Sequence, residues 1–237
     1  MNVALVTGGS RGLGYALAGG LISAGWSVVI DGRDAKVLSR AENALRAGLA
    51  KGASLVALPG DVTQPDHRAR LADAARALGG LDLLVNNAGI LGPSPLPVLV
   101  ELSPEDLRLI IEANVIAPLA LVQELAGLLR AAPCGRVIMV SSDAAVGAYP
   151  GWGGYGAAKA AVDRLGAVLA VEEPQLRVWV VDPGDLRTEM HQAAFPGEDI
   201  SDRPEPAAVV PGFLALIGSE LPSGRYLGRD LLVEEQR

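Results

Sequence analysis

A tyrosine and a lysine at helical spacing are the residues of this sequence best suited by type to acid–base chemistry. Tyr155 and Lys159 are four positions apart, so on a helix they share one face. A phenol has an ordinary pKa of about 10, and an ammonium group within about 4–6 Å lowers the pKa of an acid by about 1–3. The pair could therefore act as a general acid or base, although the same spacing also occurs on plain helix surfaces.

Two polar residues earlier in the chain could assist such a pair. Ser142 follows the apolar run Val137–Val140, where its hydroxyl could hold a substrate oxygen or simply belong to a turn. Asn114 lies inside a stretch with helical spacing, where asparagine is a mediocre helix former. It could anchor a water chain, or it could kink or cap the helix.

The segment TGGSRGLG, residues 7–14, contains four glycines between a predicted strand and a predicted helix. Glycine costs backbone entropy, so such a cluster indicates a tight turn or a close approach of the backbone to a ligand. A helix N-terminus behind a glycine turn is an anion site. Gly8, Gly12 and Gly14 are spaced G-x-x-x-G-x-G, which differs from the usual dinucleotide fingerprint. By itself the segment is also compatible with an ordinary glycine turn.

Strands and helices are predicted to alternate along the whole chain. Continuous apolar runs are typical of strands that are buried on both faces. The predicted strands are Val3–Val6, Val28–Ile30, Leu55–Leu58, Leu83–Val85, Val137–Val140, Val178–Val181 and a short one near Tyr226-Leu227. The predicted helices are Gly14–Ala24, Lys36–Leu49, Gln64–Leu78, Pro104–Leu129 and Tyr155–Val171. This alternation predicts an α/β fold: one domain over residues 1–237, with a doubly wound (Rossmann) parallel sheet and helices on both faces.

Polar residues and glycines follow most of these strands, and the carboxyl ends of parallel strands meet at one edge of a sheet, where ligands bind. They include Asp31, Asp61, Asn87, Ser142 and Gly184. One irregular stretch, residues 189–206, is rich in Pro, Asp and Glu, and a long loop of this kind is typical of a lid over a site.

Composition excludes several classes of function. The chain has 237 residues, a net charge of −7 and one cysteine, so we expect no nucleic-acid partner, no disulfide and no metal site. No apolar run reaches 18 residues, which predicts no membrane segment. We also expect no signal peptide and a cytoplasmic location. The two histidines, His67 and His191, are expected to be solvated or to cap helices.

Taken together, these motifs resemble the short-chain dehydrogenase/reductase family over about residues 2–230. The matching pieces occur in the family's order, and their joint match is specific although each is weak alone. They are residues 7–14, Asp61-Val62, Asn86-Asn87-Ala88-Gly89, Asn114, Ser142, Tyr155-x-x-x-Lys159 and Pro183-Gly184 with Thr188. The family's own glycine spacing also accounts for the unusual spacing in residues 7–14.

The resemblance implies an NAD(P)(H)-dependent oxidoreductase that interconverts a carbonyl and an alcohol. Tyr155 would exchange the proton, Lys159 would hold the nicotinamide ribose and lower the pKa of Tyr155, Ser142 would position the carbonyl, and Asn114 would hold a relay water. The implied cofactor contacts are Gly8, Ser10, Arg11, Gly12, Leu13, Gly14, Arg33, Asp61, Val62, Asn87, Ala88, Gly89, Tyr155, Lys159, Pro183, Gly184, Leu186 and Thr188. The implied substrate contacts are Ser142, Val146, Tyr149, Trp152 and Tyr155.

The end of the second predicted strand favours NADP(H) over NAD(H). In NAD-using relatives a carboxylate occupies the position of Gly32, whereas Asp31 lies one place earlier and alternation would turn it to the opposite face. Arg33 and Arg11 fall where NADP-using relatives carry basic residues. The implied substrate contacts are mostly apolar, which indicates a neutral, hydrophobic ketone or aldehyde, or the matching alcohol, as substrate.

Other interpretations of the same motifs remain. A non-catalytic dinucleotide-binding redox sensor would need only the glycine turn, and a sugar-nucleotide epimerase or dehydratase shares the Tyr–Lys pair but has a longer chain. Relatives form homodimers or homotetramers through two long helices, which correspond here to Pro104–Leu129 and Tyr155–Val171. Leu121, Leu125, Val162 and Leu165 are the expected contact residues, since both helices are apolar on more than one face.

Overall fold

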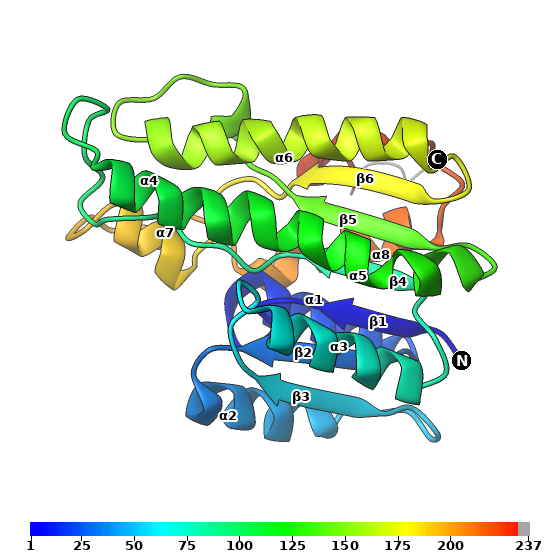
Figure 1. Ribbon diagram of the computed structural model, residues 1–237. Coiled ribbons are helices and arrows are strands. Elements are labelled where there is room, and N and C mark those ends of the chain that lie inside the picture. The colour runs from blue at the N-terminus through cyan, green and yellow to red at the C-terminus, as the bar shows by residue number, and fades with distance from the viewer. Residues whose placement is uncertain (232–237) are drawn as a thin grey trace.

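Seven parallel strands form one sheet in the computed structural model, which describes residues 1–231 (Figure 1). The strand order is β3-β2-β1-β4-β5-β6-β7, and every neighbouring pair is parallel. The strands are β1 (Val3–Val6), β2 (Ser27–Gly32), β3 (Leu55–Pro59), β4 (Leu83–Asn86), β5 (Arg136–Val140), β6 (Arg177–Asp182) and β7 (Gly224–Leu227). All seven predicted strands are present, and the predicted fold class is confirmed.

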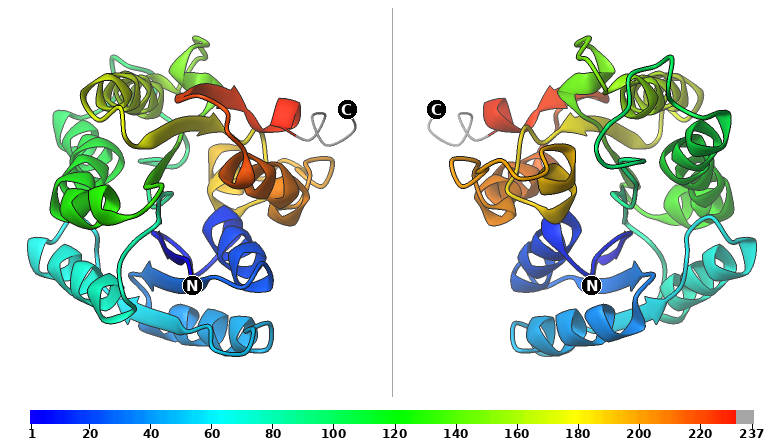
Figure 2. Two further views of the ribbon diagram at one scale, coloured as in Figure 1. Left: turned by 90° about the vertical axis from the view of Figure 1, so that its right-hand side faces the viewer. Right: turned by 90° about the vertical axis from the view of Figure 1, so that its left-hand side faces the viewer.

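Helices cover both faces of the sheet (Figure 2). One face packs against α1 (Gly12–Ser23), α2 (Ala35–Arg46) and α8 (Val210–Gly218). The other packs against α3 (Pro65–Ala77), α5 (Ala117–Ala131) and α6 (Gly153–Glu172). Successive strand residues alternate between the two cores: Ala4 and Val6 belong to the first, Val3 and Leu5 to the second. This alternation explains why the strands are continuously apolar.

The predicted helix Pro104–Leu129 is not uniform. It consists of α4 (Pro104–Ile111), a π-helical turn, η1 (Glu112–Ile116), and α5. The Ser103 hydroxyl accepts the N–H of Asp106 at the start of α4, as expected for a capping serine. The π-helical turn contains Asn114, and such turns are frequent at functional sites.

The run Pro104–Ala131 is long and apolar enough to cross a membrane, with a mean hydropathy of 1.6 over 18 residues. The search for uninterrupted apolar runs did not reveal this stretch, because charged residues such as Glu112 and Glu124 interrupt it. The run packs its inner face on the sheet, where Leu121 and Leu125 are fully buried.

The C-terminal third contains helices that apolar periodicity did not predict. The stretch 189–206 begins with α7 (Glu189–Ala194), where Thr188 accepts the N–H of His191 as N-cap. The run after it forms η3 (Pro206–Val209) and α8 despite Pro211 and Gly212, since proline is tolerated in the first turn of a helix. A short α9 (Gly228–Leu231) follows β7, and the last six residues of the predicted domain lie outside the described residues.

Candidate active site

The strand order reverses between β1 and β4, and the loops that follow these two strands meet at the carboxyl edge of the sheet. The Thr7 hydroxyl after β1 accepts the N–H groups of Asn87 and Ala88, both at 3.0 Å. The Asn87 amide donates to the Thr7 carbonyl at 2.7 Å. These bonds join the glycine turn to the Asn87-Ala88-Gly89 segment.

The glycine turn requires glycine for conformational and steric reasons. Gly8 and Gly12 have φ of 66° and 56°, in the left-handed region that glycine adopts without strain. A Cβ on Gly14 would overlap the carbonyl of Gly8 and the amide of Asn87. The helix α1 begins at Gly12, and no side chain within residues 1–231 caps its N-terminus. Open N–H groups at a helix start behind a glycine turn fit the phosphates of a dinucleotide.

Residues after β6 complete the same crevice from the other side. Gly184 has φ of 77°, and its N–H donates to the Asp182 carboxylate at 3.0 Å, which shapes the turn at Pro183. Leu186 is buried in the core. A Cβ on Gly12 would lie 3.5 Å from the Thr188 methyl, so Thr188 approaches the glycine turn. Segments more than 170 residues apart in the sequence are thereby brought together.

The Tyr155–Lys159 pair lies near the N-terminus of α6, on its inner face. Lys159 is buried, and its ammonium donates to the carbonyl of Val140 at 2.8 Å. The same Nζ lies 5.4 Å from the centre of the Tyr155 ring. Burial lowers the pKa of Lys159 to about 8, while the Asp163 carboxylate acts in the opposite direction.

The expectation that Lys159 lowers the pKa of Tyr155 is not met in this structure. Burial raises the pKa of Tyr155, and the carboxylates of Asp182 and Asp143 raise it further. Burial is the larger cause, and the carboxylates that follow β5 and end β6 add negative charge near the phenol, which opposes its ionisation.

Asn114 and Lys159 meet at Gly89. The Asn114 amide donates to the carbonyls of Ile90 and Ile110, both at 2.8 Å, and it is buried. A Cβ on Gly89 would overlap the Asn114 oxygen and would lie 4.0 Å from Lys159 Nζ. Glycine at position 89 therefore allows α6 and the π-helical turn to approach each other.

Ser142 lies directly after β5 and caps the short helix η2 (Asp143–Ala145), with its hydroxyl accepting the N–H of Ala144 at 3.2 Å. The start of α6 packs on this helix, because a Cβ on Gly156 would lie only 2.6 Å from the Ala144 carbonyl oxygen. The structure thus brings the Ser142 turn against the helix that carries Tyr155.

At the end of β2 a buried aspartate is followed, two residues later, by an exposed arginine. Asp31 is buried, and its two oxygens accept the N–H of Gly8 at 2.7 Å and pair with His67 Nε2 at 2.9 Å. Arg33 is exposed at the strand end. A Cβ on Gly32 would lie 2.8 Å from Ser10 Oγ, so the residue before Arg11 lies against this strand end.

His67 is neither solvated nor a cap, and the expectation for it was wrong. It is buried between Asp31 and Arg70, whose guanidinium approaches His67 Nδ1 at 2.9 Å. A pairing of side chains across 36 positions leaves no local signal, so sequence periodicity could not find it.

The loop after β3 contains two of the predicted cofactor contacts. Asp61 accepts the N–H and hydroxyl of Thr63 at 2.9 and 2.8 Å, and Val62 is buried beside it.

Aromatic rings gather on the side of the crevice towards α7. The Trp152 ring meets Tyr155 edge-on with centroids 5.8 Å apart, and it contacts Phe195 at 6.1 Å. His191 stacks near Phe195 at 5.0 Å, and within residues 1–231 its buried Nε2 has no hydrogen-bond partner. Val146 and Tyr149 are exposed, and the hydrogen bond to Asp143 raises the pKa of Tyr149.

A doubly wound sheet, a glycine turn that fits a dinucleotide, and a Tyr–Lys pair with a buried lysine beside it are the features of a nicotinamide-dependent enzyme. The family model described as short chain dehydrogenase matches residues 2–199. The chain belongs to the short-chain dehydrogenase/reductase family of NAD(P)-dependent oxidoreductases.

Individual relatives agree with this assignment. The chain is 34% identical to gluconate 5-dehydrogenase of Gluconobacter oxydans over 84% of this chain and 77% of the relative. It is 30% identical to the uncharacterized oxidoreductase YciK of Escherichia coli over 92% and 87%. A short-chain dehydrogenase of Shigella flexneri, solved in complex with NADP, superposes with a TM-score of 0.87 at 28% identity, covering 96% of this chain and 97% of the other.

Proposed function

We propose that this protein interconverts a carbonyl and a secondary or primary alcohol with NADP(H), with Tyr155 as the general acid and base. The observation that carries the proposal is the buried Lys159, held between the Val140 carbonyl and the Tyr155 ring. Burying a lysine costs free energy, and a structural role alone would be met by an apolar side chain. The bound nicotinamide supplies or accepts the hydride.

In the reductive direction Tyr155 would donate its phenolic proton to the substrate oxygen, and the Ser142 hydroxyl would hold that oxygen in place. Lys159 would bind the nicotinamide ribose through its ammonium group. Asn114 would hold a water near Gly89 that returns the proton. The raised pKa of Tyr155 keeps the phenol protonated, and therefore able to donate its proton, before reduction.

The residues of the crevice fit the parts of the cofactor as follows. The turn from Gly8 to Gly14 and the α1 N-terminus would bind the pyrophosphate. Asp61 and Val62 would contact the adenine, and Asn87, Ala88 and Gly89 the ribose. The carboxamide end would meet Pro183, Gly184, Leu186 and Thr188.

The substrate is expected to be neutral and hydrophobic. Val146, Tyr149 and Trp152 would line the pocket with Ser142 and Tyr155, and Phe195 extends the same apolar wall. Apolar and aromatic linings with few polar groups are typical of small-molecule sites.

The competing proposal is a dinucleotide-binding redox sensor without turnover. A panel of ketones and aldehydes with NADPH, followed at 340 nm, separates the two. We expect oxidation of NADPH with at least one apolar carbonyl. The sensor would be favoured if the protein bound NADPH tightly but neither reduced any carbonyl of a broad panel nor oxidised the matching alcohols with NADP⁺.

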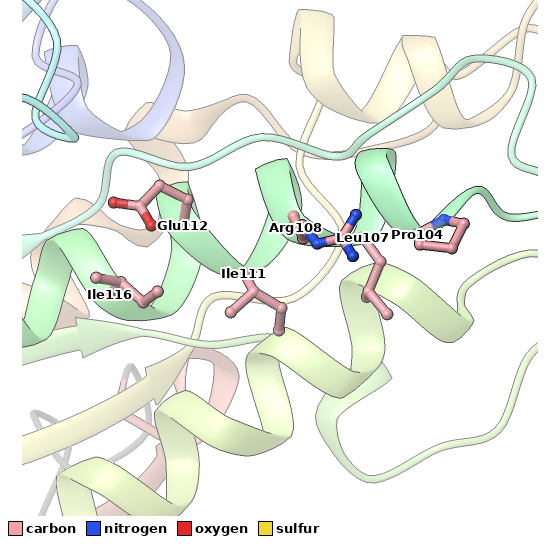
Figure 3. Close-up of a pocket in the computed structure, with 6 residues that line it drawn as sticks. All are labelled: Pro104, Leu107, Arg108, Ile111, Glu112 and Ile116. Atoms are coloured by element: carbon pink, nitrogen blue, oxygen red, sulfur yellow. The ribbon is translucent and has the colours of Figure 1, made fainter.

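We further propose that the protein forms a homodimer or homotetramer through α4, α5 and α6. Three of the four expected contact residues need correction, because Leu121, Leu125 and Val162 are buried within one chain against the sheet, whereas Leu165 is partly exposed. Their place is taken by exposed apolar residues on the outer faces: Leu107, Leu109, Ile116, Leu119, Val168 and Val171. Figure 3 shows the six side chains that line a pocket along α4 and η1: Pro104, Leu107, Arg108, Ile111, Glu112 and Ile116.

Ile116→Glu should therefore weaken self-association. A buried carboxylate without a partner is costly at an interface, whereas Ile116 is half exposed in the single chain, so folding should persist. Light scattering at micromolar concentration should give an oligomer for the wild type and a smaller species for the variant. A monomeric wild type would contradict the proposal. Ser39→Glu, on the exposed side of α2, is the control.

We also propose that residues 189–206 close over the substrate. The segment contacts the rest of the chain through the Phe195–Trp152 rings, the Ser94 hydroxyl donating to the Ala193 carbonyl at 2.6 Å and an exposed ion pair between Arg11 and Glu189. Its C-terminal part is also bonded to residues 185–187, through the Arg187 N–H to the Pro204 carbonyl at 2.8 Å and the Arg203–Asp185 ion pair at 3.6 Å. Exposed polar contacts of this kind permit local opening. Hydrogen exchange in residues 189–206 should slow when NADP(H) binds, and full protection without the cofactor would contradict a lid.

A further inference from the structure

An arginine outside the recognised motifs connects the elements that carry the proposed catalytic residues. Arg225 lies on β7, next to β6 in the sheet. Its guanidinium donates to Asp163 at 2.8 Å, to the Ser142 carbonyl at 3.1 Å and to Asp182 at 3.2 Å. Asp163 belongs to α6, Ser142 lies in the turn after β5, and Asp182 is the last residue of β6.

Each partner is adjacent to a part of the proposed site. Asp163 lies one helical turn after Lys159, and it also accepts the hydroxyl of Ser141. Asp182 accepts the N–H of Gly184 at 3.0 Å, in the turn that would hold the carboxamide. The Ser142 carbonyl belongs to the residue whose hydroxyl would hold the substrate oxygen. One planar side chain with several donors can bind all three at once.

The charges explain why an arginine is needed here. Asp182 is buried and Asp163 is largely buried, and two carboxylates near each other and near a phenol repel its ionised form. The groups that face Tyr155 are Lys159 on its own helix, Asp143 on η2 and Asp182 on β6. Arg225 and Asp163 form the next layer. Without Arg225 this layer would carry two uncompensated negative charges.

We propose that Arg225 is a positioning residue of the reaction: it neutralises Asp163 and Asp182 beside the Tyr155–Lys159 pair and ties the ends of β5 and β6 to α6. It acts through these neighbours and does not touch the substrate. The inference rests on the proposed function of Tyr155 and Lys159, so its first test reads Lys159 directly and needs no turnover.

Arg225→Gln should raise the pKa of Lys159. Removing a positive charge leaves Asp163 and Asp182 unbalanced, which favours the protonated ammonium. The sequence has three lysines, and Lys36 and Lys51 are exposed, so NMR of lysine-labelled protein can follow Lys159 from its value of about 8. We expect a rise of about 0.5 or more. Adding Asp163→Asn to this variant should reverse part of the rise, because one of the two unbalanced charges is removed and Asp182 keeps the other.

The matched control is Arg229→Gln. Arg229 lies on the next element, is exposed and is 3.7 Å from Asp230, so its replacement should leave the titration of Lys159 unchanged. Arg225→Lys is informative even where Arg225→Gln does not fold. It keeps the charge but loses the planar fork, so the pKa of Lys159 should stay near its wild-type value.

In kinetics with a confirmed alcohol substrate, Arg225→Gln should move the rising limb of kcat to higher pH, because the phenol loses its proton later. An unchanged Lys159 titration in Arg225→Gln would overturn the proposal, as would a shift of equal size in Arg229→Gln. A shifted titration in a protein whose wild type shows no turnover would instead retain the electrostatic role of Arg225 and contradict the proposed reaction at Tyr155.

Discussion

Tyr155→Phe should reduce turnover on a confirmed substrate by about 10²–10⁴-fold while NADP(H) still binds. The substitution removes only the hydroxyl, and the ring keeps its edge-on contact with Trp152. Lys159 would keep its bond to the Val140 carbonyl, so the ribose side of the crevice should change little. The measurement is kcat together with the Kd of NADPH from fluorescence.

Tyr226→Phe is the matched control. Tyr226 is partly buried and its hydroxyl donates to the Pro222 carbonyl at 2.8 Å, away from the crevice. The Tyr226→Phe variant should lose one hydrogen bond, worth about 1 kcal/mol in the free energy of unfolding, and should keep the kcat of the wild type. A Tyr155→Phe enzyme with near wild-type kcat would show that another group supplies the proton.

The fold was predictable because its signals are local. Each strand is a short apolar run buried on both faces, and each main helix repeats apolar residues at helical spacing. The glycine turn was predictable for the same reason, since Gly8, Gly12 and Gly14 lie within seven positions. The π-helical turn at Asn114 was not predictable, because its residues continue the helical pattern on both sides.

The parts of the site that were missed depend on contacts between distant residues. Asp31 pairs with His67 across 36 positions, and Arg225 reaches Ser142 across 83. The contact residues proposed for assembly failed for a related reason. A helix that is apolar on two faces does not reveal which face meets the sheet, and Leu121 and Leu125 meet it. The charge around Tyr155 also required the structure, because Asp143 and Asp182 act from other elements.

NADPH should be preferred over NADH in kcat/KM, and Arg33→Ala should reduce the efficiency with NADPH by about 10- to 100-fold. Arg33 is exposed at the end of β2, and Arg11 follows Ser10, whose hydroxyl would lie 2.8 Å from a Cβ on Gly32 at the same strand end. Two guanidinium groups there would bind a 2′-phosphate, whose oxygens match their donors. Asp31 would not repel that phosphate strongly, because its oxygens are already engaged by Gly8 and His67.

The same substitution should change the efficiency with NADH only slightly, since that cofactor lacks the 2′-phosphate, so selectivity should fall. Arg46→Ala is the control: Arg46 lies at the far end of α2 and pairs with Glu42 within the helix, and its loss should alter neither cofactor's kcat/KM. Glu189→Gln adds a second check, because it frees Arg11 from its ion pair and should strengthen NADPH binding. An enzyme that prefers NADH, with Arg33→Ala leaving that preference untouched, would show that the ribose faces a carboxylate and not the two arginines.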